Sequence, residues 1–179
     1  DIAHANGKPI LLCLGNTYTP FVNFAFPAAN RTTSINYLMS VLDQYGYDGF
    51  DINCEGGSGW MADYKLWFKE LYDSLQTRTN AYTWTGHPLL TAAAQSGAAQ
   101  GAMFADIDQY ADMIHLMSYD KMADWNCMVF HESGLYSYDA NNVNFAISNL
   151  YGGTCNGSNN NMQTAQFFFR TQIARVGAE

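Results

Sequence analysis

Charged side chains are scarce in this sequence, and basic ones are scarcer than acidic ones. Only 13% of the 179 residues are charged, with 8 Lys and Arg against 16 Asp and Glu, which gives a formal net charge of −8. A basic face able to follow a phosphate backbone is therefore not expected, and no nucleic acid partner is predicted. A neutral or apolar ligand fits this composition better.

Long hydrophobic runs are also missing. No stretch approaches the ~20 apolar residues that cross a bilayer, so no membrane span is expected. The chain begins Asp-Ile-Ala-His, without an initiator Met or a signal-peptide pattern. We therefore expect that it does not begin where its gene begins.

The four cysteines show no CxxC or Cys/His spacing of the kind that builds a zinc site. The sequence thus predicts neither a metal nor another cofactor. Cys13 and Cys54 fall on predicted strands and are expected to be free thiols. Cys127 and Cys155 fall in loop-like segments, where they could form a disulfide in an oxidising compartment.

Two Asn-x-Ser/Thr triplets, at Asn30 and Asn156, are possible glycosylation sites in predicted surface loops. Such triplets are common by chance. They favour a secreted or extracellular protein only weakly.

What the sequence does contain is apolar residues, at 48% of the chain, enough for one globular domain. Short apolar runs that resemble buried strands alternate with segments of helical periodicity. The predicted strands are 9–14, 49–54, 88–94 and 113–118. The predicted helices are about 35–42, with Ser34 as N-cap and Gly46 as stop, then 64–75, 105–110 and 164–176.

This order predicts parallel strands joined by helical crossovers. Two architectures fit: a small doubly wound sheet, or part of a (βα)8 barrel, which typically needs ~250 residues. The short chain favours the first. In both, the carboxyl ends of the strands carry the chemistry.

One such strand end is unusually acidic. Side chains alternate along a strand, so Asp51, Asn53 and Glu55 point to one face of the segment YGYDGFDINCEG. They form a satisfied polar layer, cap the next helix, or belong to a functional site. Clustered carboxyls in a partly dry site separate one another's pKa values, which can keep a Glu protonated as a general acid. Glu55, the outermost, is the candidate.

Residues 48–55, DGFDINCE, resemble the DGxDxDxE signature of family-18 glycosidases, the chitinase and chitinase-like family. Three further segments resemble family motifs in the same order: 11–16 (LLCLGN) the SxGG strand, with Gly15 as its first glycine, 89–93 (LLTAA) the next strand, and 117–120 (MSYD) the MxYD motif.

The resemblance implies a parallel (βα)8 barrel of which this chain covers strands three to six. Residues 1–179 would be the central portion of a single catalytic-type barrel domain. An isolated half barrel would expose two sheet edges. We therefore expect missing chain ends or an assembly partner to supply the rest.

The resemblance also implies substrate-assisted retaining hydrolysis of β-linked N-acetylglucosamine polymers. Glu55 would protonate the leaving oxygen and then activate water. The residue at 53 would accept a hydrogen bond from the acetamide N–H. Asp51 would share a proton or a hydrogen bond with the residue at 53. Asp48 and Gly49 would support the strand. The remaining pocket residues implied are Tyr119 on the acetamide oxygen, Met117 as the floor and Asp120 on sugar hydroxyls.

Asn53 departs from the family pattern, which has Asp there. An amide accepts an N–H but cannot offset developing positive charge as a carboxylate does. Two functions therefore stay open: a hydrolase of normal or reduced rate, or a non-catalytic sugar-binding or structural protein. Trp60 and Trp125 follow the acidic residues by five positions each, and either stack on sugar or pack.

Overall fold

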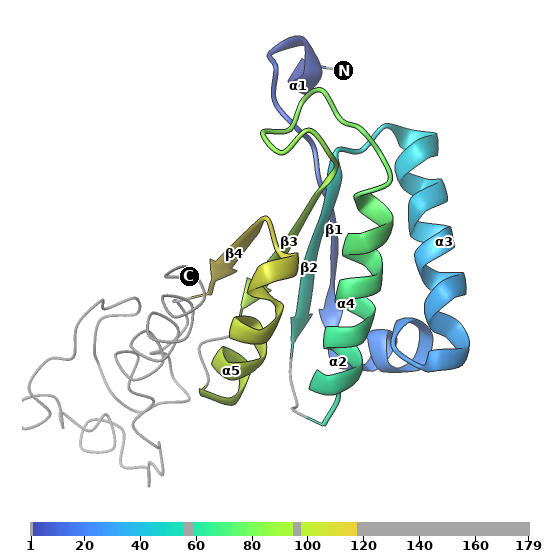
Figure 1. The fold of residues 1–179 in the computed structure, drawn as a ribbon, viewed down its shortest axis with the longest axis vertical. Helices are drawn as coiled ribbons and strands as arrows, with labels where there is room; N and C mark the ends of the chain where they lie inside the picture. Colours follow the sequence, from blue (N-terminus) through green and yellow to red (C-terminus); the bar gives the residue numbers. More distant parts are fainter. Residues whose placement is uncertain (1, 56–58, 95–97, 118–179) are drawn as a thin grey trace, which may run out of the picture.

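The computed structural model describes residues 2–55, 59–94 and 98–117, and within them the chain builds a four-stranded parallel sheet (Figure 1). The strands lie side by side in chain order, β1-β2-β3-β4. They are β1 (Leu12–Thr17), β2 (Gly49–Glu55), β3 (Leu89–Ala94) and β4 (Met113–Leu116). The predicted parallel α/β architecture is confirmed.

Three long helices connect the strands and cover one face of this sheet (Figure 1). They are α3 (Ala28–Tyr45), α4 (Met61–Leu75) and α5 (Ala98–Ile107). Shorter elements are α1 (Ile2–Ala5), α2 (Tyr18–Pro20), the π-helical η1 (Phe21–Ala25) and the 3-10 turn η2 (Asp108–Tyr110). A doubly wound sheet carries helices on both faces. The sequential strand order with one covered face instead forms a partial barrel.

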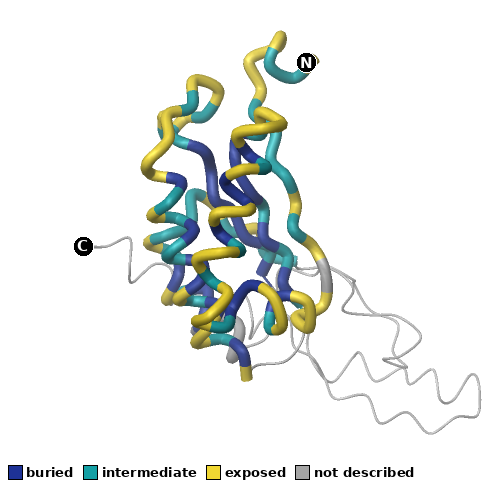
Figure 2. Tube along the Cα trace, turned by 90° about the vertical axis from the view of Figure 1, so that its right-hand side faces the viewer, coloured by how far each residue is buried: buried dark blue, intermediate teal, exposed yellow. Residues whose placement is uncertain are grey.

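The core lies between the sheet and these helices. Alternate strand residues, among them Phe50, Ile52 and Leu90, are fully buried against α4 residues such as Trp67 and Phe68. Figure 2 shows buried positions running through the strands while exposed positions recur along the helices. The helical periodicity predicted this for α4, where the residues spaced along one face of the helix are all buried: Tyr64, Trp67, Phe68, Leu71 and Leu75.

The start of α3 differs from the prediction. The helix begins at Ala28 after Pro27, so Ser34 lies inside it and is not its N-cap. Its first buried residue is Ile35, and because the two preceding turns bury no apolar residue, apolar periodicity missed them. The hydroxyl of Ser34 donates to the Arg31 carbonyl at 2.8 Å. Asn30 consequently lies exposed in the first turn of a helix, not in a loop.

The other end of α3 agrees with the prediction. Gly46 is the C-cap, with φ of 69°, and its N–H donates to the Leu42 carbonyl. This left-handed conformation is the one that glycine adopts without strain.

β1 begins and ends later than the sequence predicted. Its register with β2 runs from Leu12 opposite Phe50 to Thr17 opposite Glu55. The preceding Ile10 N–H instead donates to the Asp48 carboxylate at 2.6 Å. The carboxyl ends of β1 and β2 therefore reach the same level, where the acidic residues lie.

Candidate functional site

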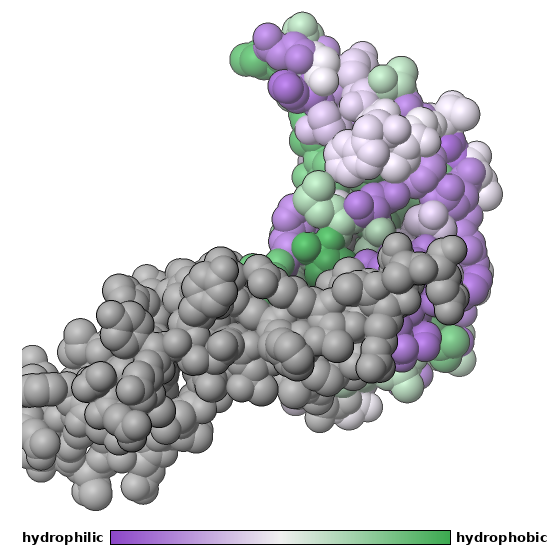
Figure 3. All heavy atoms as spheres, turned by 60° about the vertical axis from the view of Figure 1, so that its left-hand side comes forward, coloured by the Kyte–Doolittle hydropathy of each residue, from purple (hydrophilic) through white to green (hydrophobic). Residues whose placement is uncertain are grey.

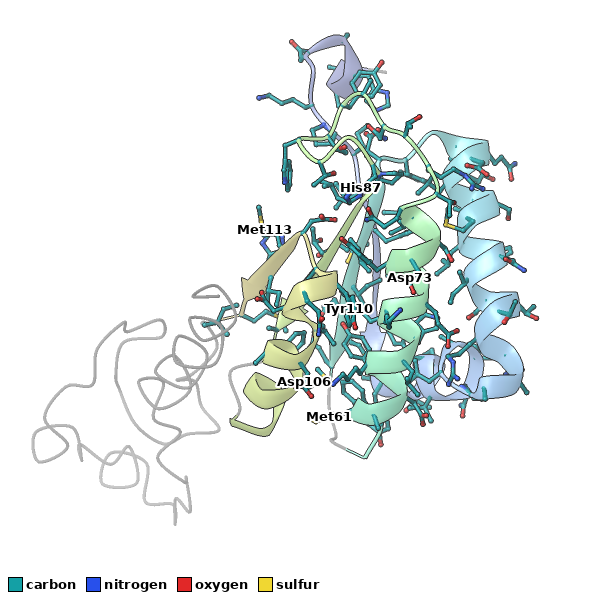
Figure 4. All side chains as sticks on the ribbon, viewed as in Figure 1. Met61, Asp73, His87, Asp106, Tyr110 and Met113 are labelled. Atoms are coloured by element: carbon teal, nitrogen blue, oxygen red, sulfur yellow. The ribbon has the colours of Figure 1, made fainter. Side chains whose placement is uncertain are left out.

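The sheet face turned away from α3, α4 and α5 carries the polar side chains. Asp51, Asn53 and Glu55 alternate with the buried Phe50, Ile52 and Cys54, as strand geometry requires. Met113 of β4 extends from the sheet away from α4 and α5 (Figure 4). Figure 3, which brings this side forward, shows hydrophobic residues among polar ones there. The residues sharing this face include Cys13, Gly15 and Thr17 on β1, Thr91 and Ala93 on β3, and Met113 and His115 on β4.

Asp51 is held from both neighbouring strands. It lies opposite Cys13 on β1 and Thr91 on β3. The Thr91 hydroxyl donates to Asp51 Oδ1 at 2.5 Å, and the Cys13 thiol also hydrogen-bonds to this carboxylate. Burial, this bond and the negative charge of Asp51 raise the pKa of Cys13.

Asn53 bonds toward the carboxyl end of the strand. Its Nδ2 donates to Glu55 Oε1 at 3.0 Å. Its Oδ1 is buried, and within the described residues no group donates to it. On the neighbouring strand, a Cβ at Gly15 would lie 3.8 Å from the Asn53 Cβ. The site thus presents one unused acceptor next to the acid.

Asp48 lies at the opposite end of β2, 2% exposed. Its carboxylate accepts from His4 Nε2 at 2.7 Å, from the Ile10 N–H, and from Asn80 Nδ2 at 2.7 Å. Burial raises the pKa of Asp48, but the bonds from Asn80, Ile10 and His4 outweigh it and hold this pKa below its ordinary value. Asp48 thereby ties α1, the start of β1 and the loop before β3 to β2.

Trp60 is only 5% exposed and packs among Phe26, Tyr64 and Tyr18. The prediction that Trp60 could stack on sugar is therefore corrected, because the Trp60 ring packs in the hydrophobic core. Met117 directly follows β4, and its N–H donates to the Ala94 carbonyl.

Several predicted residues lie outside the described part of the chain. They are Tyr119, Asp120, Trp125, Cys127, Cys155, Asn156 and the helix 164–176.

Sequence reasoning missed Thr91 and His4. Thr91 reads as one polar residue in an apolar strand, LLTAAA, and only its position opposite Asp51 gives it a partner. His4 is 44 residues from Asp48, too distant for a local pattern to pair them.

Both described cysteines are free, as predicted. Burial, together with the charge of Glu55, raises the pKa of Cys54 to about 12. A thiol that stays protonated at neutral pH is a poor nucleophile.

Among the described residues, no three His, Cys, Asp or Glu side chains are arranged to hold a metal ion. In the same residues, no helix has the length and apolar character needed to span a membrane.

An inward acid column at the end of a parallel strand is the arrangement that the DGxDxDxE resemblance implied. The family model for glycosyl hydrolases family 18 matches residues 1–171. The chain belongs to glycosyl hydrolases family 18.

Two curated relatives in this family are an endochitinase of Metarhizium robertsii and a probable endochitinase of Caenorhabditis elegans. The first is 27% identical over 144 residues, covering 78% of this chain and 34% of the relative. The second is 34% identical over 122 residues, covering 65% of this chain and 20% of the relative. This family-18 chain thus spans between about a fifth and a third of their lengths.

Solved structures show the same fold. An immunomodulatory active chitinase from Trichuris suis superposes with a TM-score of 0.67 at 22% identity, covering 92% of this chain and 43% of that one. The human pseudo-chitinase YKL-39, with retained chitooligosaccharide binding, superposes with a TM-score of 0.60 at 20% identity, covering 69% and 36%. The four strands here therefore form part of a family-18 (βα)8 barrel.

Proposed function

We propose that the full protein is a chitinase-like hydrolase that cleaves β-linked N-acetylglucosamine polymers by substrate-assisted retaining hydrolysis. The observation that carries this proposal is the Asn53–Glu55 pair at a strand's carboxyl end, which combines a carboxyl group with an amide oxygen to which no group in the described residues donates. Family membership supports the reaction class.

In the proposed reaction the sugar's own acetamide is the nucleophile. Its oxygen bonds to the anomeric carbon while the glycosidic bond breaks, and Glu55 gives its proton to the leaving oxygen. Water then attacks the same carbon of the cyclic oxazolinium, and Glu55 takes a proton from that water. Two displacements at one carbon return the original configuration. Tyr119, Met117 and Asp120 are proposed to line the same sugar pocket.

The Asn53 Oδ1, which accepts no hydrogen bond from the described part of the chain, suits the acetamide N–H, which needs one acceptor. Nδ2 meanwhile bonds to Glu55, so the amide would orient acid and nucleophile together. A carboxylate at residue 53 would offset the positive charge of the oxazolinium, whereas an amide does not. The loss of a transition-state interaction of this kind typically costs about 10²–10³ in rate. We therefore propose slow turnover for the native protein.

A second candidate function rests on this substitution. A sugar-binding protein without turnover needs the acceptor at residue 53 but not a carboxylate. The pseudo-chitinase among the structural neighbours combines a similar fold with chitooligosaccharide binding.

Replacing Glu55 tests the hydrolase proposal. In the full-length protein, Glu55→Gln removes the proton donor while keeping shape, so we expect turnover of an N-acetylglucosamine hexamer to fall at least ~10²-fold while its Kd changes little. The matched control is Glu70→Gln on the outside of α4, where the carboxylate pairs with Arg31 at 3.0 Å. Equal turnover in Glu55→Gln and wild type would contradict the acid assignment.

We further propose that the protein acts outside the cell, where its polymeric substrate would lie. The exposed Asn30 is a candidate glycan acceptor. The rest of the barrel, from further chain or an assembly partner, is proposed to cover the open edges of β1 and β4. In this proposal, residues 1–179 are the central part of one catalytic-type domain.

A further inference from the structure

Three residues lie side by side on β1, β2 and β3, two positions before Asn53 along β2. They are Cys13, Asp51 and Thr91. Thr91 is 3% exposed and one of two buried polar or charged residues in the described chain, the other being Asp48. A buried hydroxyl among apolar neighbours is costly unless it is bonded. Thr91 uses its proton on Asp51.

We propose that Thr91 is a positioning residue that fixes the Asp51 carboxylate beneath the Asn53–Glu55 pair. This inference rests on the proposed function, since it assigns Thr91 a part in the same site. Thr91 would act through Asp51 and would not touch the sugar.

The geometry gives the hydroxyl a specific task. Asp51 is a carboxylate two residues before Asn53 on the same face, so one rotation about its side chain would bring it toward the amide. The 2.5 Å hydrogen bond from the buried Thr91 hydroxyl on β3 favours an orientation of the Asp51 carboxylate away from the Asn53 amide. The Asn53 Nδ2 then stays on Glu55. Without the hydroxyl, Asp51 keeps only the weaker bond from the Cys13 thiol and competes with Glu55 for the Asn53 donor.

Two substitutions separate this role from simple packing. Thr91→Val keeps the branched shape and removes the hydroxyl, whereas Thr91→Ser keeps the hydroxyl and removes a methyl group. Both would be made in the full-length protein, with native Asn53 and also with Asn53→Asp.

We expect Thr91→Val to lower kcat on an N-acetylglucosamine hexamer by roughly 10- to 100-fold, as for loss of a hydrogen bond to a charged group, with KM nearly unchanged. Thr91→Ser should retain kcat within about threefold. A packing role would instead affect thermal stability in both variants without separating kcat from KM. Equal kcat in Thr91→Val and Thr91→Ser would overturn the proposal.

A crystal structure of each variant gives a readout that does not require turnover. Asp51 should leave its wild-type position in Thr91→Val and keep it in Thr91→Ser. An unmoved Asp51 in Thr91→Val overturns the positioning role, whatever the activity. Absence of turnover with both Asn53 and Asn53→Asp, with Asp51 moving as expected, would instead refute the proposed hydrolase and leave Thr91 as the support of a binding site.

Discussion

At the scale of single residues, two polar side chains with different roles lie at the two ends of β2. Asp48 at the amino end joins three segments through its hydrogen bonds, and Glu55 at the carboxyl end bonds to a neighbouring amide. The length of β2 therefore separates a support, which directly precedes the strand, from a candidate catalytic group at its carboxyl end. This is the division between the two ends of a (βα)8 barrel, in which chemistry lies at the carboxyl ends of the strands.

The Asp48 carboxylate makes the free energy of unfolding depend on pH in the acidic range. Its pKa is held below its ordinary value of about 3.9, so its contribution is fully present above that pH and is lost as the pH falls through the folded-state pKa. We expect Asp48→Asn to lower the unfolding free energy of the full-length protein by about 1.5–3 kcal/mol at neutral pH. The difference from wild type should shrink below about pH 4.

Urea unfolding across this pH range measures the effect. The control is the exposed Asp63→Asn in the first turn of α4, which should lower the unfolding free energy by less than about 1 kcal/mol. A difference between Asp48→Asn and wild type that stays constant into acid would show that the ionised carboxylate is not what stabilises the fold.

At the scale of elements, the close approach of β2 and β3 requires glycine at position 49. Gly49 begins β2 with φ of 146°, and a Cβ there would lie 2.0 Å from the Leu89 carbonyl oxygen. Next to it, the Leu89 N–H donates to the Asp48 carbonyl at 2.8 Å. The pairing of β2 with β3 therefore begins where no side chain fits.

Gly49→Ala should accordingly destabilise the protein by about 3 kcal/mol or more, because backbone strain and overpacking each cost about 1–3 kcal/mol. Gly59→Ala is the control, since a Cβ at Gly59 meets nothing within 4 Å. Thermal unfolding of both variants checks this. Similar melting temperatures for Gly49→Ala and wild type would contradict the close strand approach.

The sequence predicted the elements better than their ends. The strand at 49–54 and the helix at 64–75 were predictable because alternation and helical periodicity both reflect burial. The first turns of α3 were not, since they bury no apolar residue before Ile35. In the site, local alternation predicted that Asp51, Asn53 and Glu55 share a face. Thr91 needed the register between β2 and β3, which no local pattern contains.

At the scale of the whole molecule, the sheet has two open edges within the described residues, β1 and β4. Beside β1 lies an apolar pocket of about 310 Å³ between the strand, η1 and α3, with Phe24 and Tyr37 on its wall 73% and 69% exposed. A further βα unit of the barrel would bury such a surface.

A complete barrel built on this sheet is proposed to retain hydrolysis, which the amide at residue 53 slows. The most direct measurement is kcat for an N-acetylglucosamine hexamer with the full-length protein, as wild type and as Asn53→Asp. We predict measurable turnover in the wild type and an increase of about 10²–10³-fold in the variant. No turnover in either protein would contradict the proposed hydrolysis.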